Sequence, residues 1–286
     1  MLVLFSMLGL LVTGLVADQI FDFGGGDDND ESEPNLIEGS RENDIIDGTE
    51  AEDLIFGLGG DDTINGSAGS DRIHGGIGDD RIFGGRGDDR LDGQYGDDRI
   101  RGGAGGGRLL GHEGDDHLYG GAGSDRISGW NGSDRLFGGA GADYLVGGAG
   151  ADILRGGGGD DFLNGGDSYI HRIDRSGDVL SGGSGDDFLR LQPEDIGTGG
   201  SGEDVFRRDF HYSGSATITD FNPAEDTIEC EYNTDRGVPV VTVQDFADGT
   251  GASVLMDGLV VAEVTGGQGL SPSDIILIPH TPFSEY

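Results

Sequence analysis

Large apolar side chains recur at every ninth position through the middle of this 286-residue chain. Counting from Gly39, the eighth residue of each nonapeptide is apolar, as at Ile46, Ile55 and Ile64, and the register holds without a slip to Asn164. A nine-residue period matches neither the 3.6-residue repeat of a helix nor a long alternating strand. It predicts a short strand and a turn that alternate many times, because internal repeats of this kind build solenoids.

The unit of this repeat has two further fixed positions. Fourteen nonapeptides follow one another in residues 39–164, and more units occupy 173–181, 182–190 and 199–207. The sixth residue is aspartate in every unit but one, in which Gly107 takes its place. Glycine fills the first position of all fourteen contiguous units, and it permits the positive φ angles of a tight turn. We therefore expect a six-residue turn followed by a three-residue strand.

The predicted fold is all-β, a parallel β-roll. Side chains alternate along a strand, so position eight points inward while positions seven and nine point outward. Two units would make one coil of eighteen residues, and successive coils would stack at about 4.8 Å, the distance between paired strands. Two parallel sheets would then enclose a thin core of Ile and Leu. The insertion Gly165–Arg172 and the segment Leu191–Thr198 depart from the period and are expected to bulge from an edge or end the roll.

The charge of the chain adds a cation to this picture. Asp and Glu total 55 against 17 basic residues, and the formal net charge is −38. Such a charge repels phosphate backbones, so we expect no nucleic-acid partner. Position-six carboxylates stacked in columns repel one another by about 1 kcal/mol per pair even in water. A calcium ion between adjacent turns would turn this repulsion into attraction. Calcium accepts six to eight oxygen ligands in irregular geometry, whereas magnesium requires a smaller octahedral arrangement.

The predicted calcium ligands are position-six carboxylates together with the turn carbonyls of glycines at positions one and four. The carboxylates are those of Asp62, Asp71, Asp80, Asp89, Asp98, Asp116, Asp125, Asp134, Asp143, Asp152, Asp161 and Asp187. The glycines are Gly75, Gly78, Gly84, Gly87, Gly120, Gly123, Gly138 and Gly141. One buried side chain per nine ordered residues is little apolar burial for the chain entropy lost, so calcium binding and folding are predicted to be one event.

Three positions are expected to bind calcium less well. Gly107 removes a carboxylate from the middle of one column, and the sites that use this position should be weak or empty. The first two units carry Glu42 and Ala51 where position four is otherwise glycine, which suits a capping coil with weak or no binding.

The nonapeptide G-G-x-G-x-D-x-U-x, in which U is a large apolar residue, resembles the calcium-binding repeat of RTX proteins. The resemblance covers residues 39–207. It implies a right-handed β-roll with several Ca2+ ions between its turns, export by type I secretion machinery, and folding outside the cell. The segment from Ile218 through Pro223 to Ile228 resembles the region after the repeats in serralysin-type proteases, where an uncleaved C-terminal secretion signal follows.

The chain therefore divides into four predicted segments. Residues 1–17 form an apolar N-terminal segment, 18–38 an acidic linker, 39–207 the roll, and 208–286 a β-rich C-terminal cap with a secretion signal. Residues 1–17 are short for a membrane span and lack the positive n-region of a signal peptide. Three interpretations stay open for them: a membrane-associated tether, an atypical signal peptide, or neither. The expected location is extracellular, with the cell surface as the alternative if residues 1–17 act as a tether.

No catalytic activity is expected from the sequence. Only 38 residues precede the first repeat, too few to bury a core of their own. His112, Glu113 and His117 approach a zincin motif, but the histidines are five residues apart instead of four and lie in repeat units, not on a helix. Cys230 is the only cysteine, and we expect it to be a small buried hydrophobe in a strand.

A surface-binding role is the alternative function. Arginine recurs at position seven, and Arg72, Arg90, Arg108 and Arg126 are expected to form a ladder on one outer sheet. Such a ladder could hold an anionic polysaccharide in a surface adhesin or matrix protein. The competing interpretation is that the arginine stems cover the sheet while their charges offset the aspartate columns.

Overall fold

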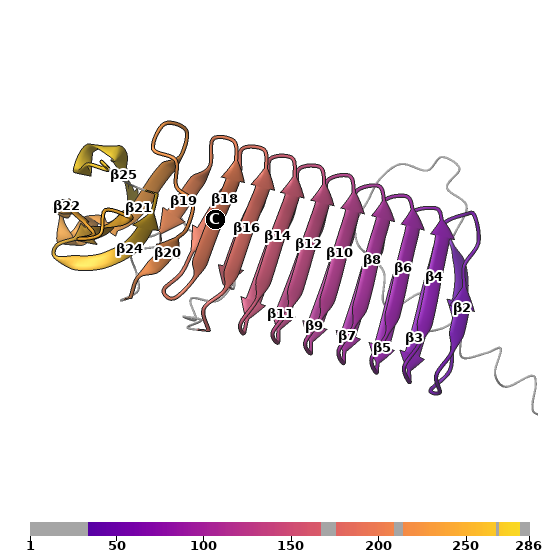
Figure 1. Cartoon of the computed structure of the whole chain (residues 1–286). Coiled ribbons are helices and arrows are strands. Elements are labelled where there is room, and N and C mark those ends of the chain that lie inside the picture. The colour runs from indigo at the N-terminus through magenta and orange to yellow at the C-terminus, as the bar shows by residue number, and fades with distance from the viewer. Residues whose placement is uncertain (1–33, 167–175, 209–213, 267–268, 281–286) are drawn as a thin grey trace, which may run out of the picture. The chain divides into compact units, whose positions relative to one another are not determined.

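The computed structural model describes residues 34–166, 176–208, 214–266 and 269–280, apart from the side chains of Arg236 and His280. Within these ranges the chain winds between two sheets, so that β1 to β21 each pair in parallel with the strand two places along the sequence. Figure 1 shows the even-numbered strands β2 to β18 side by side in front of the odd-numbered ones. The apolar segment 1–17 and nearly all of the acidic linker lie outside the described residues.

Sheet I contains the odd-numbered strands of the roll and β25. In spatial order it consists of β1 (Asn35–Glu38), β3 (Asp53–Gly59), β5 (Arg72–Ile77), β7 (Arg90–Tyr95), β9 (Arg108–Glu113), β11 (Arg126–Asn131), β13 (Tyr144–Ala149), β15 (Phe162–Gly166), β17 (Phe188–Leu191), β19 (Val205–Arg208), β21 (Thr227–Asn233) and β25 (Ile275–His280).

Sheet II contains the even-numbered strands and β23. In spatial order it consists of β2 (Ile45–Asp47), β4 (Thr63–Ala68), β6 (Arg81–Arg86), β8 (Arg99–Ala104), β10 (His117–Ala122), β12 (Arg135–Ala140), β14 (Ile153–Gly158), β16 (Val179–Ser184), β18 (Ile196–Ser201), β20 (Ala216–Ile218), β24 (Leu259–Thr265), β23 (Gly251–Met256) and β22 (Val241–Asp245).

The register of these sheets confirms the eighteen-residue coil. Ile73 pairs with Leu91 and Ile82 with Ile100, so residues at equal positions of alternate units stand beside each other. The predicted division of the unit was wrong, however. A typical strand runs for six residues, from position seven through position three of the next unit, and leaves three for the turn. Gly76 adopts a left-handed φ of 120° at position two and still pairs with its neighbours, so the strand continues past it.

The core is a single stack of apolar side chains, as the period predicted. Position-eight residues from Ile55 to Leu189 are at most 2% exposed, and Ile46 at the start is 8% exposed. Every coil thus contributes one side chain from each sheet to the space between them. Hydrophobic burial is therefore thin and evenly divided along the roll.

The segment Leu191–Thr198 completes a turn of the roll, so the expectation that it would bulge or end the roll was wrong. Asp195 occupies the sixth position, and β18 pairs with β16 through Leu180 and Gly197. Gly197 has no side chain to place in the core. The side chain of Leu191 fills that space, because a Cβ built on Gly197 would lie 3.0 Å from its Cδ2. A residue from the preceding strand thus takes the place of the missing core side chain.

The insertion 165–172 leaves both sheets intact around it. Phe162 pairs with Phe188, and Gly158 with Ser184, which restores the ladder across 26 residues instead of 18. Gly165 and Gly166 belong to β15, while residues 167–175 lie outside the described ranges. The roll therefore continues through this point.

The C-terminal region extends both sheets with less regular strands. β20 and β21 add parallel strands, and β22, β23 and β24 form an antiparallel meander on sheet II. Short 3-10 helices occur at η1 (Thr234–Arg236) and η2 (Pro272–Asp274). Cys230 is a buried free cysteine in β21, as expected. Among the described residues, no helix has both the length and the apolar character needed to cross a membrane.

Candidate calcium sites

The position-six aspartates form two columns, one leading into each sheet. In both columns the Oδ1 atom of one aspartate accepts a hydrogen bond from the backbone N–H of the aspartate one coil earlier, as from Asp62 to Asp80 at 2.8 Å. Column I leads into sheet I and contains Asp53, Asp71, Asp89, Gly107, Asp125, Asp143, Asp161, Asp187, Asp204 and Asp226. Column II leads into sheet II and contains Asp44, Asp62, Asp80, Asp98, Asp116, Asp134, Asp152, Asp178 and Asp195.

The second carboxylate oxygen of most of these aspartates is buried and has no hydrogen-bond donor in the part of the chain that the structure describes. This holds for the Oδ2 atoms of Asp62, Asp71, Asp80, Asp89, Asp98, Asp116, Asp125, Asp134, Asp143, Asp161, Asp187 and Asp204. The residues themselves are at most 3% exposed. A buried polar atom without a partner costs roughly 1–3 kcal/mol, and more when it is charged. Such a large number of these oxygen atoms in one fold indicates an ion that supplies the missing interaction.

The electrostatics of the columns point the same way. Burial raises the pKa of Asp98 to about 7 and that of Asp116 to about 8, and like-charged aspartates in neighbouring coils add to both shifts. Burial raises the pKa of Asp187 to about 7 for the same two reasons. Each raised pKa means that the protein around the carboxyl disfavours its charged form. A bound cation between the coils would remove that penalty.

Glycine carbonyls complete the surroundings of each orphaned oxygen. A Cβ built on Gly75 would collide with Asp80 Oδ2 and would lie 3.0 Å from the carbonyl oxygen of Gly93, one coil further on. A Cβ on Gly120 would likewise meet Asp125 Oδ2 and would lie 2.7 Å from the carbonyl oxygen of Gly138. Position-one glycines therefore border a space that contains a carboxylate and a carbonyl and has no room for a side chain.

Position-four glycines bring turn carbonyls of adjacent coils together. Gly78 has a φ of 135°, and a Cβ on it would collide with the carbonyl oxygen of Gly60 in the previous coil. Gly87, Gly123 and Gly141 are in the same situation. In the described ranges no three side chains of His, Cys, Asp or Glu converge on one point. A cation at these turns therefore needs backbone carbonyls as well as carboxylates, and calcium accepts this oxygen-only mixture.

Of the twenty predicted ligand residues, the aspartates and the position-four glycines lie in these turns, whereas Gly75, Gly84, Gly120 and Gly138 lie within strands β5, β6, β10 and β12. The structure places the predicted aspartates in the two columns and the predicted glycines at the first and fourth positions next to them. Their assignment as ligands remains a prediction. Sequence reasoning missed Asp195 and Asp226, which continue columns II and I beyond the regular repeats. Their hydrogen bonds follow the rest of the column, although the spacing between units has changed.

The ends of the columns differ from the middle in a way that fits a cap. Asp44 Oδ2 accepts from the Ser40 N–H at 2.6 Å, and Asp53 Oδ2 accepts from the Thr49 N–H at 2.6 Å. Asp195 Oδ2 accepts from the Gln192 N–H at the other end of column II. These carboxylates obtain from the chain the partner that the middle ones lack. Weak or absent binding in the first coil stays a prediction, and the hydrogen bonds supply a physical reason for it.

Gly107 leaves a gap in column I without disturbing the backbone. The Arg108 N–H donates to the Asp89 carbonyl at 2.8 Å and the Arg126 N–H to the Gly107 carbonyl at 2.9 Å, as in other coils. Leu109 is fully buried. A Cβ on Gly102 would have Gly120 O as its nearest neighbour, at 2.6 Å, and no carboxylate oxygen among its three nearest atoms. One carboxylate is missing here, and the backbone pairing of the coil is unchanged.

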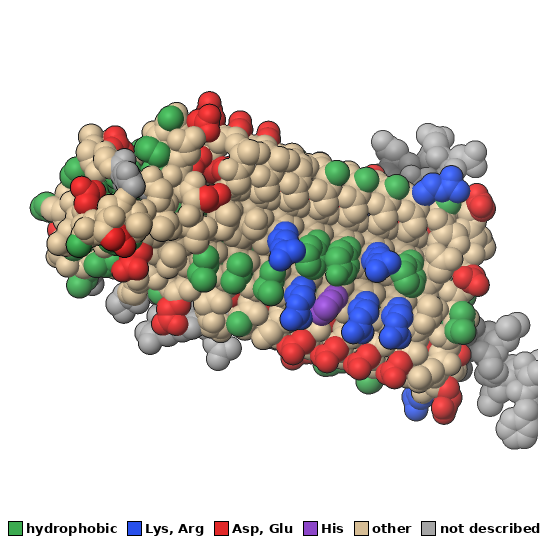
Figure 2. All heavy atoms as spheres, viewed as in Figure 1, with side chains coloured by type: hydrophobic (Ala, Val, Ile, Leu, Met, Phe, Trp, Pro, Cys, Tyr) green, Lys and Arg blue, Asp and Glu red, His purple; other side chains and the backbone are tan. Residues whose placement is uncertain are grey.

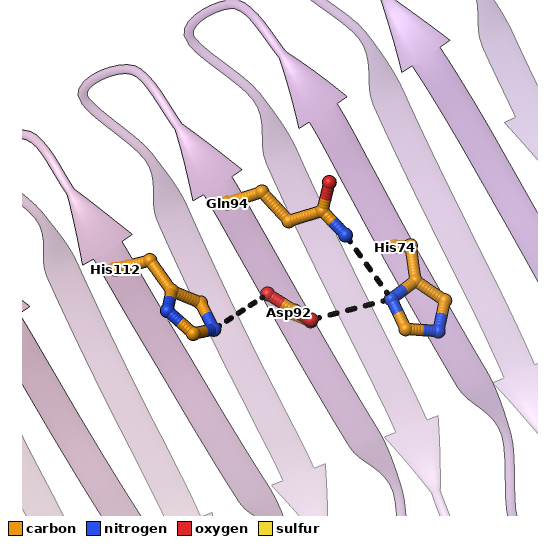
Figure 3. Close-up of polar contacts among 4 residues, drawn as sticks. All are labelled: His74, Asp92, Gln94 and His112. Carbon is orange, nitrogen blue, oxygen red and sulfur yellow. Dashed lines mark hydrogen bonds and ion pairs between the residues drawn. The ribbon is translucent and has the colours of Figure 1, made fainter.

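A second polar cluster lies on the outer face of sheet I, away from the columns. Asp92 contacts two histidines from neighbouring strands, with 3.3 Å between its Oδ2 and His74 Nδ1 and 3.3 Å between its Oδ1 and His112 Nε2 (Figure 3). Burial alone would raise the pKa of Asp92, but these histidines outweigh it and hold that pKa well below its usual range. The contact with Asp92 raises the pKa of His112.

The residues of the near-zincin pattern do not come together. His112 belongs to β9 in sheet I, and His117 belongs to β10 in sheet II. His117 contacts Arg135 instead, with 3.1 Å between its Nε2 and an arginine nitrogen. The structure thus places the two histidines on separate sheets with different partners.

Comparison with known families agrees with this geometry. The family described as the RTX calcium-binding nonapeptide repeat matches residues 38–73, 74–109, 110–145, 137–168 and 175–191, more than half of the chain. The protein therefore belongs to the RTX repeat family, and calcium is the cation that its repeats bind. The match ends before the region that resembles serralysin-type proteases.

Two further comparisons add little. The solution structure of the AlgE6R3 subunit from the Azotobacter vinelandii mannuronan C5-epimerase is 24% identical in sequence, and the match covers 57% of this chain and 77% of that one. Its TM-score is 0.25. A search of the curated proteins found no match.

Proposed function

We propose that this protein binds several calcium ions between the stacked turns of its roll and that binding and folding are coupled. The observation that carries the proposal is the set of twelve buried Oδ2 atoms that lack a donor. Residues such as Asp80, Asp98 and Asp116 would supply carboxylate oxygens, and glycines such as Gly75 and Gly78 would supply the turn carbonyls. The ion contributes positive charge in a place where the chain has none.

Coupling follows from the balance of forces in one coil. Each coil buries two position-eight side chains, and it also brings two carboxylates into a poorly hydrated column. Without a cation, these charges oppose the same stacking that buries the apolar rungs. Calcium that binds only the stacked form stabilises that form by mass action.

Calorimetry of the full chain tests this proposal. Calcium should bind with a stoichiometry of several ions per chain, and magnesium at equal concentration should produce little heat, because it keeps its hydration water. A stoichiometry near zero, or equal binding of magnesium, would contradict the assignment of these turns as calcium sites.

Export and location belong to the same proposal. A roll that needs calcium stays unfolded where calcium is scarce, and this state suits passage through type I secretion machinery into an extracellular space. The serralysin-like segment 218–228 and the C-terminal residues beyond it are the candidate secretion signal. Co-expression of the chain, with and without residues 269–286, together with a type I exporter tests this proposal. The amount of protein in the medium is measured, and export should require residues 269–286.

A second candidate function is a calcium-dependent contact with the cell surface or with an anionic polysaccharide. The observation that favours it is the arginine ladder, since Arg72, Arg90, Arg108 and Arg126 stand in register on sheet I as predicted. No catalytic activity is assigned to either role.

A further inference from the structure

The outer face of sheet II carries two rows of side chains that differ from the rest of this acidic protein. Position seven contributes Arg81, Arg99, His117 and Arg135, in register across β6, β8, β10 and β12. Position nine contributes Phe83, Arg101, Tyr119, Phe137 and Arg155, in register from β6 to β14. Figure 2 shows the position-seven row as basic side chains with one histidine, and the position-nine row as a mixture of basic and hydrophobic side chains, on the near face. We call these nine residues the arginine–aromatic strip.

The arginines of the strip are not neutralised by the protein. Among the described residues, no hydrogen bond or ion pair joins Arg81, Arg99, Arg101 or Arg155 to a carboxylate, although the chain carries 55 acidic residues. Arg135 contacts only His117, and burial together with the neighbouring Arg135 and Arg99 lowers the pKa of that histidine. The interpretation that arginine charges offset the aspartate columns therefore finds no contact on this face.

Aromatic rings of the strip hold two of its guanidinium groups in place, those of Arg101 and Arg155. The Arg101 guanidinium carbon lies 5.9 Å from the centroid of the Phe83 ring and 5.6 Å from that of Tyr119. The Arg155 guanidinium carbon lies 5.5 Å from the Phe137 ring centroid. Cation–π contacts of this kind order an arginine and leave the N–H groups at its edge available to a planar anion.

The shape of the charged area selects a narrow linear partner. The exposed position-five carboxylates Asp61, Asp79, Asp97 and Asp115 precede β4, β6, β8 and β10 and form an acidic rim beside the position-seven row (Figure 2). A lipid surface or a nucleic-acid duplex is broad enough to meet that rim and would be repelled by it. A single polyanionic chain lying along the strip would avoid it.

The ring geometry separates polysaccharide from single-stranded nucleic acid. Bases bind to such surfaces by stacking on free aromatic faces. Here Tyr119 stacks on Phe137 at 4.7 Å between centroids, and arginines occupy the outer face of each ring. Both faces of Tyr119 and Phe137 are thus covered, and at these two rings the strip offers guanidinium forks and no stacking platform.

We propose that the arginine–aromatic strip binds a linear acidic polysaccharide, with the guanidinium groups of Arg99, Arg101 and Arg155 contacting its carboxylate or sulfate groups. The four strands β8 to β14 place these arginines over about 14 Å at the strand spacing of about 4.8 Å. The inference rests on the proposed function, because the strip exists only in the wound roll. It also moves the contact from the predicted sheet I ladder to the opposite sheet.

The test measures the affinity of the full chain for oligogalacturonate, which carries carboxylates, and for dextran sulfate, with neutral dextran as the blank. The triple variant Arg99→Gln, Arg101→Gln, Arg155→Gln should bind roughly tenfold more weakly, because exposed charge pairs contribute modestly each. The same charge is removed from the competing sheet I ladder with Arg72→Gln, Arg90→Gln, Arg108→Gln, and this variant decides between the two faces. If the strip and not the ladder is the site, it should bind nearly as well as the unaltered chain. Binding should also weaken as salt is raised.

Three results would overturn the inference. The first is that neither polymer binds to a chain that circular dichroism shows to be folded. The second is an equal loss of binding in both triple variants. The third is that oligothymidylate binds as tightly as the polysaccharides. Binding of one polymer and not the other assigns the carboxylate or the sulfate as the recognised group. A roll that is folded and binds polysaccharide without calcium would refute the proposed function while this inference stands.

Discussion

Columns I and II run along alternate turns of the same roll, and the main difference between them is at one position. Column II is an unbroken series from Asp44 to Asp195, and column I has Gly107 in the middle. The coil at Gly107 keeps its strand pairing and its buried Leu109. The comparison shows that the shape of the roll does not require a carboxylate at position six. This result favours the proposed ligand role for the carboxylates of the other coils.

The electrostatics of the two columns differ in the same place. Burial and the neighbouring Asp134 and Asp98 raise the pKa of Asp116 in column II to about 8. Beside the gap in column I, burial raises the pKa of Asp89 to about 6, and only Asp88 adds a like charge. Burial is the largest cause of both pKa shifts, and like-charged column neighbours add to the shift of Asp116 alone.

Breaking column II should produce the largest effect. Asp116→Asn keeps the shape of the side chain and removes its charge, so the calcium stoichiometry should fall. The loss of one site should cost about 3 kcal/mol of stability when calcium is about 100-fold above its Kd. Denaturant unfolding in calcium measures this, with the exposed neighbour substitution Asp115→Asn as the matched control. Equal losses in the two variants would show that position six has no special role.

Acid should partly replace calcium, most strongly in column II. The folded-state pKa values of Asp98 and Asp116 are about 7 and 8, against about 3.9 for unfolded aspartate. Because the folded form binds protons first, the metal-free roll gains stability as the pH falls from about 8 towards 4, and it loses that stability as the pH rises again.

Circular dichroism in chelator at about pH 8, 6.5 and 5 measures this gain as increasing β-structure. Asp116→Asn should flatten the pH dependence, since it removes the group with the highest of these pKa values. In calcium the direction reverses: protonation below about pH 7 competes with the ion and raises the calcium midpoint. If the β-structure content of the metal-free chain did not change with pH, this would argue against raised pKa values of the buried carboxylates.

Repairing column I should give a smaller effect. Gly107→Asp should add calcium-binding capacity, because it restores the missing carboxylate in an intact coil. A Cβ at this position would lie 2.9 Å from a methyl group of Leu109, which has to move slightly, so the gain in stability should be less than the loss from Asp116→Asn. Calorimetry counts the ions, and Gly106→Asp, which adds the same charge one residue away, is the control. An unchanged stoichiometry in Gly107→Asp would contradict the assignment of position six.

Backbone strain in the strands of sheet I should have the smallest effect on stability. Gln94, His112 and Trp130 have φ angles near 80° at position two of adjacent sheet I coils, where glycine is usual. Gln94→Gly should raise stability by about 0.5 kcal/mol, since relief of roughly 1–2 kcal/mol of left-handed strain exceeds the extra entropy of unfolded glycine. Gln94→Ala keeps the strain and should not stabilise. A loss of stability in Gln94→Gly would show that the Gln94 side chain contributes more than its strain removes.

The sequence predicted the features that recur at the same position of every unit, and it missed the contacts that join residues of different units. Positions six and eight identified the columns, the core from Ile46 to Phe206 and the gap at Gly107, because one physical role recurs at one spacing. The unit that contains Asp195 was missed because Gly197 stands at its position eight, and the side chain of Leu191, from the preceding strand, fills that core space instead. The pattern also gave no reason to expect six-residue strands, since pairing through left-handed Gly76 depends on neighbouring coils.

Contacts across coils were missed for a related reason. His74, Asp92 and His112 are 18 and 20 residues apart, and they meet only when the chain is wound. Arg101 and Tyr119 are joined in the same way. Writing the sequence in rows of eighteen would have placed each pair side by side and is the signal that was available.

The most direct test of the account is a calcium titration of the full chain by far-ultraviolet circular dichroism, starting in chelator near neutral pH, with magnesium as the control. The account predicts a cooperative change from coil to β-structure at about 0.1–1 mM calcium and none with magnesium. A chain that is already β-rich in chelator and does not change on addition of calcium would contradict it.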